Sequence, residues 1–188
     1  MKQDRDGYLT GQLLIAMPGM RDTRFARSVV YLCAHNAEGA MGLVVNKLLD
    51  SVSFEELLQQ LGIEARPGQP LSIHFGGPVE SGRGFVLHSA DYKQDSTLEV
   101  DGRIALTATL DVLRDIAQGG GPKRHLFALG YAGWGPGQLD QELQANGWLT
   151  AEADGRLVFG SDHAAKWDGA IARLGIDPAR LTFDAGHA

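Results

Sequence analysis

A single cysteine, Cys33, is the only thiol in this chain of 188 residues. One cysteine excludes an intramolecular disulfide and agrees with a reducing compartment. The six histidines also lack the close spacing, such as His-x₃-His, that announces a zinc site. We therefore expect no cofactor and no metal, and interpret the histidines as hydrogen-bonded side chains at strand ends. A site built from distant residues, such as His74 with His88, is the alternative.

Long apolar runs are absent as well. Stretches such as Leu13–Met17 are far too short to span a bilayer, and residues 1–6 carry mixed charges with no signal-peptide-like apolar run after them. We expect a cytoplasmic protein with no membrane partner. The 44% hydrophobic and 21% charged residues suffice for one sizeable core. The predicted organisation is a flexible N-terminus over residues 1–8 and one domain over residues 9–188.

The sequence has few positive charges: it contains 17 Lys and Arg but 23 Asp and Glu, which gives a net charge of −6. Proteins that grip many phosphates concentrate positive charge, and this chain has neither a basic helix nor a helix-turn-helix pattern. Direct nucleic-acid binding is therefore not expected. Two small basic clusters are interpreted as solvated surface, with a phosphate contact as the alternative: Arg21, Arg24 and Arg27, and the pair Lys123-Arg124.

Motifs of covalent catalysis are missing too. No Gly-x-Ser-x-Gly elbow is present. Cys33 lies in the apolar run Val29–Ala34, where a buried thiol is inert. Strand alternation nevertheless predicts that His35 shares a face with Cys33. The sequence establishes no reaction, so whether the protein is an enzyme stays open.

The hydrophobic periodicity predicts an α+β protein. Ser53 with Glu56 forms a capping-box pattern, which predicts a helix that ends at Gly62. Strands cluster early and helices follow irregularly, which favours α+β over a doubly wound parallel sheet. Strands are predicted over residues 9–17, 28–35, 41–46, 71–75, 84–88, 103–107, 125–131 and 156–160, with 28–35 and 41–46 as a hairpin, and helices over 109–118, 138–146 and from Asp162 to Gly175.

Two glycine-rich loops are the most distinctive segments. Residues 130–138 read Gly-Tyr-Ala-Gly-Trp-Gly-Pro-Gly-Gln between a predicted strand and a predicted helix, an arrangement that can hold an anion. The P-loop and dinucleotide fingerprints are missing, so we favour a turn that buries Trp134 with its indole N–H on a carbonyl. Residues 76–80 admit the same two interpretations. If the loops meet, Trp134, Asn46 and His88 would line a shared pocket.

Four stretches together resemble the YqgE/AlgH family of bacterial proteins. They are Leu13–Pro18 with Asp22, Phe25 and Arg27–Tyr31; Gly39–Lys47; Gly76–Val79 with Arg83–His88; and Leu129–Trp134 with Gly137–Leu139, Glu142 and the closing Gly186–Ala188. Their order and spacing cover nearly the whole chain. The resemblance implies an α+β fold whose mixed or split, partly barrel-like β-sheet is surrounded by helices.

The resemblance also implies a bacterial cytoplasmic protein of a kind often labelled a transcriptional regulator, with no family catalytic or ligand-binding residues to carry over. Our leading hypothesis is a non-enzymatic regulatory or adaptor protein acting through a protein or small-molecule partner. The alternative is an enzyme or small-molecule-binding protein with a pocket near loops 76–80 and 130–138. The candidate ligand-binding residues are Asp22, Asn46, Gly76, Gly77, His88, Trp134 and Gln138.

Overall fold

The computed structural model describes residues 8–64, 71–177 and 180. Most of the predicted flexible N-terminus, residues 1–8, and the closing Gly186–Ala188 lie outside the described residues. The bounds of the predicted domain at residues 9 and 188 stay a prediction. None of the helices within the described ranges is long and apolar enough to cross a membrane.

The first three strands form a meander. They are β1 (Gln12–Ala16), β2 (Val29–Asn36) and β3 (Gly39–Val44), and β2 pairs antiparallel with both of the others. Asn36 Oδ1 accepts a hydrogen bond from the N–H of Glu38 at 2.8 Å, which closes the turn between β2 and β3. The predicted hairpin is confirmed.

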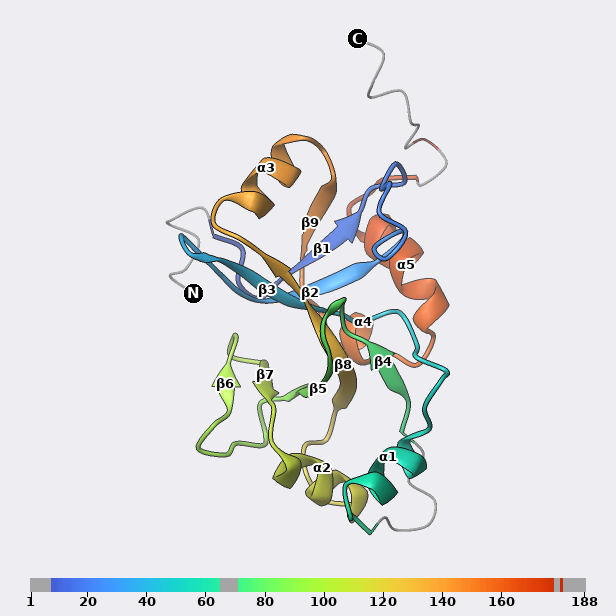
Figure 1. Ribbon diagram of the computed structural model, residues 1–188. Coiled ribbons are helices and arrows are strands. Elements are labelled where there is room, and N and C mark those ends of the chain that lie inside the picture. Colours follow the sequence, from blue (N-terminus) through green and yellow to red (C-terminus); the bar gives the residue numbers. More distant parts are fainter. Residues whose placement is uncertain (1–7, 65–70, 178–179, 181–188) are drawn as a thin grey trace.

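The strand β8 (His125–Trp134) organises the rest of the sheet. It pairs antiparallel with β5 (Val79–Ser89) and β3, and parallel with β4 (Ile73–Phe75). The remaining strands are β6 (Leu98–Glu99), β7 (Ile104–Thr107) and β9 (Trp148–Glu152). The resulting sheet has the order β6-β7-β5-β8-β3-β2-β1-β9, with β4 on the side of β8 (Figure 1). The sheet is a curled, largely antiparallel half-barrel. Together with the helices it forms an α+β fold, which confirms the expected fold class.

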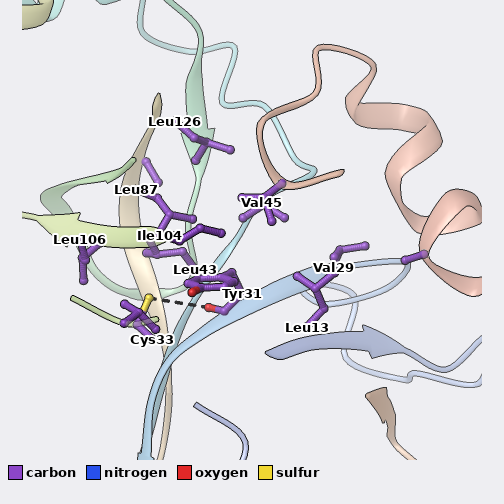
Figure 2. Packing of buried hydrophobic residues seen from close by; sticks show 14 of the residues in the cluster. Leu13, Val29, Tyr31, Cys33, Leu43, Val45, Leu87, Ile104, Leu106 and Leu126 are labelled. Carbon is purple, nitrogen blue, oxygen red and sulfur yellow. Dashed lines mark hydrogen bonds between the residues drawn. The ribbon is translucent and has the colours of Figure 1, made fainter. Parts of the chain in front are cut away.

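The main core fills the curve of this sheet. Leu13, Val29, Tyr31 and Leu43 from the meander pack there with Leu87 and Leu126 from the β5–β8 pair (Figure 2). Each such aliphatic side chain contributes about 1.5–3 kcal/mol when removed from water. Two smaller apolar clusters lie under the helices α1 (Phe54–Gln60) and α2 (Leu110–Ala117) and under α3 (Gln138–Gln144).

Two of the helical segments begin at side-chain caps that the sequence shows. Ser53 Oγ accepts from the N–H of Glu56 at 3.1 Å and starts α1 (Phe54–Gln60), as predicted. Asp162 Oδ1 accepts from the N–H of Ala165 and starts a 3₁₀ turn before α5. The other helices are α2 (Leu110–Ala117), α3 (Gln138–Gln144) and α4 (Gly155–Phe159), the 3₁₀ turn spans His163–Ala165, and α5 spans Lys166–Arg173.

The predicted strand at 156–160 is wrong, because residues 156–159 belong to α4 and Gly160 is its C-cap. Asp154 accepts a hydrogen bond from the N–H of Arg156 at 2.7 Å and so caps a helical turn there. The strand of this region is β9, which ends at Glu152, before α4 begins at Gly155. In α2, Leu110 is 44% exposed, whereas Val112, Leu113, Ile116 and Ala117 are buried.

The prediction that Cys33 and His35 share a face is wrong. The β2–β3 register shifts between Leu32 and Ala34, and such a bulge inserts an extra residue that reverses the alternation after it. Cys33 therefore points into the main core, where its Sγ lies 3.8 Å from the Tyr31 carbonyl oxygen (Figure 2). His35 lies against α3, with Nε2 3.5 Å from Asp140. Burial raises the pKa of Cys33 to about 12, which leaves the thiol protonated.

Candidate functional site

The two glycine-rich loops meet in the structure, backbone against backbone. A Cβ built on Gly76 would overlap the Gly130 carbonyl oxygen, and one built on Gly77 would overlap the Tyr131 carbonyl group. Gly130 itself has φ +76° and faces Gly77. Only glycine permits this approach, because any other side chain would occupy the space of the opposite strand. The contact brings Val79 opposite Tyr131 in the β5–β8 ladder.

A groove opens beside this contact, between the β2–β3 hairpin, β5 and the C-terminal half of β8. Its volume is about 620 Å³, which lies within the range of about 300–1,000 Å³ that is typical of small-molecule sites. We call it the aromatic groove. It is lined by Ala34, Asn36, Glu38, Gly39, Ala40, Met41, Val79, Arg83, Phe85, Tyr131, Gly133 and Trp134.

The walls of the aromatic groove are mainly apolar. The Phe85 and Tyr131 rings meet edge to face, with centroids 5.8 Å apart. The Arg83 guanidinium lies 5.1 Å from the Phe85 ring centroid and 3.4 Å from Glu80 Oε2. Desolvation, followed by a hydrogen bond with Glu80, raises the pKa of the Tyr131 hydroxyl. The site therefore offers a flat apolar wall beside an exposed cation, and its tyrosine stays neutral at physiological pH.

Trp134 closes one end of the groove, and a carboxylate on α3 accepts a hydrogen bond from its indole. Its side chain is buried, and Nε1 donates to Glu142 Oε1 at 3.2 Å. Trp148 Nε1 donates to the same oxygen at 3.0 Å, and Gln138 Nε2 donates to Oε2 at 2.9 Å. The predicted burial of Trp134 is confirmed. The predicted carbonyl partner is wrong, because one glutamate on α3 accepts from both indoles.

The segment between β8 and α3 satisfies its own backbone. Gln138 Oε1 accepts from the N–H of Gly135 at 3.0 Å, and Gly137 takes φ +72° as the residue before the helix. These contacts set the entry of α3, as the turn interpretation predicts. The N–H of Gly135 is already engaged, which disfavours the anion-binding alternative for this loop.

A family model described as AlgH-like matches residues 13–179. The chain belongs to the AlgH-like family. The chain is 58% identical over 187 residues to a UPF0301 protein of Rhodospirillum rubrum, an alignment that covers 99% of this chain and 97% of the relative. It is 55% identical over 192 residues to a UPF0301 protein of Bradyrhizobium diazoefficiens, with 97% of this chain and 89% of the relative covered. The expected family is confirmed.

Two solved structures share the fold of this AlgH-like protein. The solution structure of the AlgH protein from Pseudomonas aeruginosa superposes with a TM-score of 0.80, 44% identity and full coverage of both chains. The crystal structure of a protein from Corynebacterium diphtheriae gives a TM-score of 0.66 at 22% identity, covering 91% of this chain and 88% of the other. The second likeness concerns the fold alone.

The structure does not bring the predicted site residues of this AlgH-like protein into one pocket. Trp134 lines the aromatic groove, Gln138 donates to the glutamate that holds Trp134, and Gly76 and Gly77 form the backbone contact beside the groove. Asn46 instead ties two segments together, since Oδ1 accepts from the N–H of Val29 at 2.9 Å and Nδ2 donates to the Arg27 carbonyl at 2.8 Å.

Asp22 and His88 lie elsewhere in the AlgH-like fold. Asp22 receives two hydrogen bonds from the Arg24 side chain, at 3.0 and 2.8 Å, and these lower its pKa. His88 is fully buried, with Nε2 2.7 Å from Thr107 Oγ1 and Nδ1 2.8 Å from the Ser89 carbonyl oxygen. Its hydrogen bonds are those of the structural histidine that the sequence favoured.

A cluster of three basic side chains, of which His74 and Lys166 are buried and His163 is partly exposed, was not predicted from the sequence. His74 Nδ1 donates to the Phe127 carbonyl at 3.2 Å, so Nε2 is the nitrogen that accepts from His163 Nδ1 at 3.3 Å. Lys166 Nζ donates to the carbonyls of Val45 and Val158, at 2.8 and 2.7 Å. Their spacing in sequence gave no signal, because β4 and α5 bring them together only in the folded protein.

The electrostatics of this cluster follow from burial. Burial, followed by the positive charges of His163 and Lys166, lowers the pKa of His74 to about 3. Burial also lowers the pKa of Lys166 to about 8. Both carbonyl contacts of Lys166 stabilise its ammonium form, so we interpret this lysine as a tie between β3 and α4. Over the described ranges, no group of three or more His, Cys, Asp or Glu is placed to hold a metal ion.

Proposed function

We propose that this chain is a non-enzymatic regulatory or adaptor protein of the bacterial cytoplasm whose action on a partner is controlled by a small molecule in the aromatic groove. The observation that carries the proposal is the composition of that groove. Its volume of about 620 Å³ lies within the range of small-molecule sites. Its apolar wall suits a flat hydrophobic body, and Arg83 suits an anionic group at the edge of that body.

The lining of the groove supports binding more than chemistry. General acid–base catalysis needs groups with pKa values near the working pH, and nucleophilic catalysis needs a nucleophile beside a base. The ionisable side chains that line the groove are Glu38, Arg83 and Tyr131, and the pKa of the tyrosine is raised rather than lowered. An enzyme remains the alternative, but its candidate residues Asp22, Asn46 and His88 lie outside the groove.

Direct DNA binding is not the mode that we propose for a regulator of this family. The net charge is −6. Of the first basic cluster, Arg24 pairs with Asp22, and Arg27 lies 3.5 Å from Asp168 and 4.3 Å from the Trp167 ring centroid. Arginines held in this way are poorly placed to displace counterions from a duplex.

The test fills the aromatic groove without disturbing the backbone. A Cβ on Gly133 would make ordinary contacts, 3.4 Å from the Tyr131 ring and 3.7 Å from Val79, so Gly133→Leu should fold with its side chain in the groove. The probe is anilinonaphthalene sulfonate, an apolar aromatic anion whose fluorescence rises on binding. We expect saturable binding to the wild type and at least tenfold weaker binding to Gly133→Leu.

The matched control is Gly102→Leu, where an added Cβ meets nothing within 4 Å. It lies outside the groove and should bind the probe as the wild type does. In a bacterium that carries the gene, replacement by Gly133→Leu should reproduce the expression changes of a deletion, whereas Gly102→Leu should not. Equal probe binding by both variants would refute the groove, and a silent Gly133→Leu allele would refute its regulatory role.

A further inference from the structure

A second concave site lies where the start of β8 meets α4. It is lined by Lys123, Arg124, His125, Gly155, Arg156, Phe159 and Gly160 and has a volume of about 400 Å³. We call it the basic pocket. Its cations come from two segments more than thirty residues apart, so the fold and not the local sequence brings them together. The sequence alone indicated only Lys123-Arg124, as solvated surface.

The three cations of the basic pocket make no contact ion pair with a carboxylate of the described chain, although Lys123 attracts Asp91 and Arg156 attracts Asp154. Within the part of the chain that the structure describes, Lys123, Arg124 and Arg156 form no ion pair. Several arginines elsewhere on this acidic protein are paired: Arg24 with Asp22, Arg83 with Glu80, Arg114 with Asp111 and Arg173 with Asp154.

The nearest acidic side chains are already engaged. Asp154 pairs with Arg173 at 2.7 Å and caps α4 through the N–H of Arg156. Asp91 accepts from the backbone N–H of Lys123 at 3.0 Å and from the Ser89 hydroxyl. Both carboxylates act on backbone or on other partners, so the three cationic heads keep their hydrogen-bonding capacity.

Two further details shape the basic pocket. A Cβ on Gly155 would come within 3.2 Å of Arg124 Nη1, so the glycine makes room for the guanidinium against the chain. His125 Nδ1 is buried without a hydrogen-bond partner among the described residues. A buried polar atom without a partner is uncommon in native proteins and is typical of sites that receive a ligand or a water molecule.

We propose that the basic pocket binds a small phosphorylated molecule of the diphosphate class. A phosphate group carries about −1.5 to −2 charges at neutral pH, so two linked phosphates match three cations better than one. Arginine forks bind phosphate oxygens in pairs, and two arginines here face one cavity. A compact ligand fits better than a duplex, which needs cationic contacts along its length.

The test is isothermal titration of the intact protein with inorganic pyrophosphate at constant ionic strength. We expect one saturable site in the wild type. Arg124→Gln and Arg156→Gln should each weaken binding roughly tenfold, which corresponds to about 1.4 kcal/mol. Arg103→Gln is the matched control, since Arg103 is exposed, forms no ion pair in the described chain and lies outside the pocket. It should bind as the wild type does, and so should Gly133→Leu.

In NMR spectra, a shift of the amide and ring signals of His125 on addition of pyrophosphate would place the ligand at the basic pocket. No binding by the wild type, or equal weakening in the Arg103→Gln control, would overturn the proposal. If sulfate binds as tightly as pyrophosphate, the pocket is a nonspecific anion site, and the proposed diphosphate ligand is wrong. Tighter binding of a duplex oligonucleotide than of pyrophosphate, lost in the same two variants, would assign the pocket to nucleic acid instead.

Discussion

The two ends of β8 differ in chemistry although one strand carries both. At its start, His125 belongs to the basic pocket, where three cations form no ion pair within the described chain. At its end, Trp134 closes the aromatic groove and is fixed by Glu142. β8 runs between these sites through the middle of the molecule (Figure 1). At the Trp134 end, the polar groups hydrogen-bond to one another within the protein. At the His125 end, the positive charges of the basic pocket are available to a ligand.

The difference separates stability from binding. Side chains that bury area and satisfy one another hold a fold, whereas exposed charges contribute little to it and remain available for a ligand. We therefore expect substitutions at the end of β8 to lower the free energy of unfolding, and substitutions at its start to change only ligand affinity.

The largest effect should come from Trp134→Ala. Truncation removes a buried aromatic ring that is 7% exposed and leaves Glu142 with one indole donor fewer. The expected loss is about 3–5 kcal/mol in the free energy of unfolding, measured by urea denaturation. A loss below about 1 kcal/mol would mean that Trp134 serves the groove and not the fold, and the contrast between the two ends would disappear.

A middle-sized effect should depend on pH and lie beside β8, at His74 of β4, which pairs with Ala128 of β8. Unfolded His74 takes up a proton below its ordinary pKa of 6.5, whereas folded His74 does so only near 3. Stability is therefore lost as the pH falls through this window. Between pH 7 and pH 5 the wild type should lose about 2 kcal/mol more than His74→Gln.

Urea denaturation of both proteins at the two pH values measures this difference. The other histidines titrate in both proteins, so they cancel in the comparison. Equal losses in the wild type and the variant would show that His74 is not held neutral by its burial.

The smallest effect is expected at the basic end of β8. Arg124→Gln and Arg156→Gln should each change the free energy of unfolding by less than about 0.5 kcal/mol, because neither side chain is buried or ion-paired in the described structure. Thermal unfolding beside Arg103→Gln checks this. A loss above about 1.5 kcal/mol in either variant would make that arginine part of the fold and weaken the case for a ligand.

Local signals in the sequence predicted much of the fold. The Ser53 cap, the β2–β3 hairpin and the strand before the 130–138 loop depend on residues close in sequence, and each is confirmed. The errors arise where one residue changes a local pattern. Asp154 caps a helix in a segment that reads as a strand, and the bulge at Cys33 sends His35 to the other face.

The candidate sites were harder to predict, because each combines distant segments. The glycine-rich loops did indicate the position of the aromatic groove, because two backbones that approach so closely need glycine and glycines can be seen in the sequence. Met41, Phe85 and Tyr131 read as ordinary core residues. For the basic pocket, Arg156 meets Lys123-Arg124 only through the packing of α4, and no spacing in the sequence announces that contact.

The pairing of β1 with β9 also has a consequence for biosynthesis. Leu13 lies opposite Ala151 in this ladder, so a strand made early by the ribosome waits for one made near the end. Contacts so distant in sequence slow folding, because a long loop must close before they form. A nascent chain that ends before residue 148 lacks the strand that covers the outer edge of β1. Truncated or stalled products of this gene should therefore be the forms that chaperones retain and proteases remove.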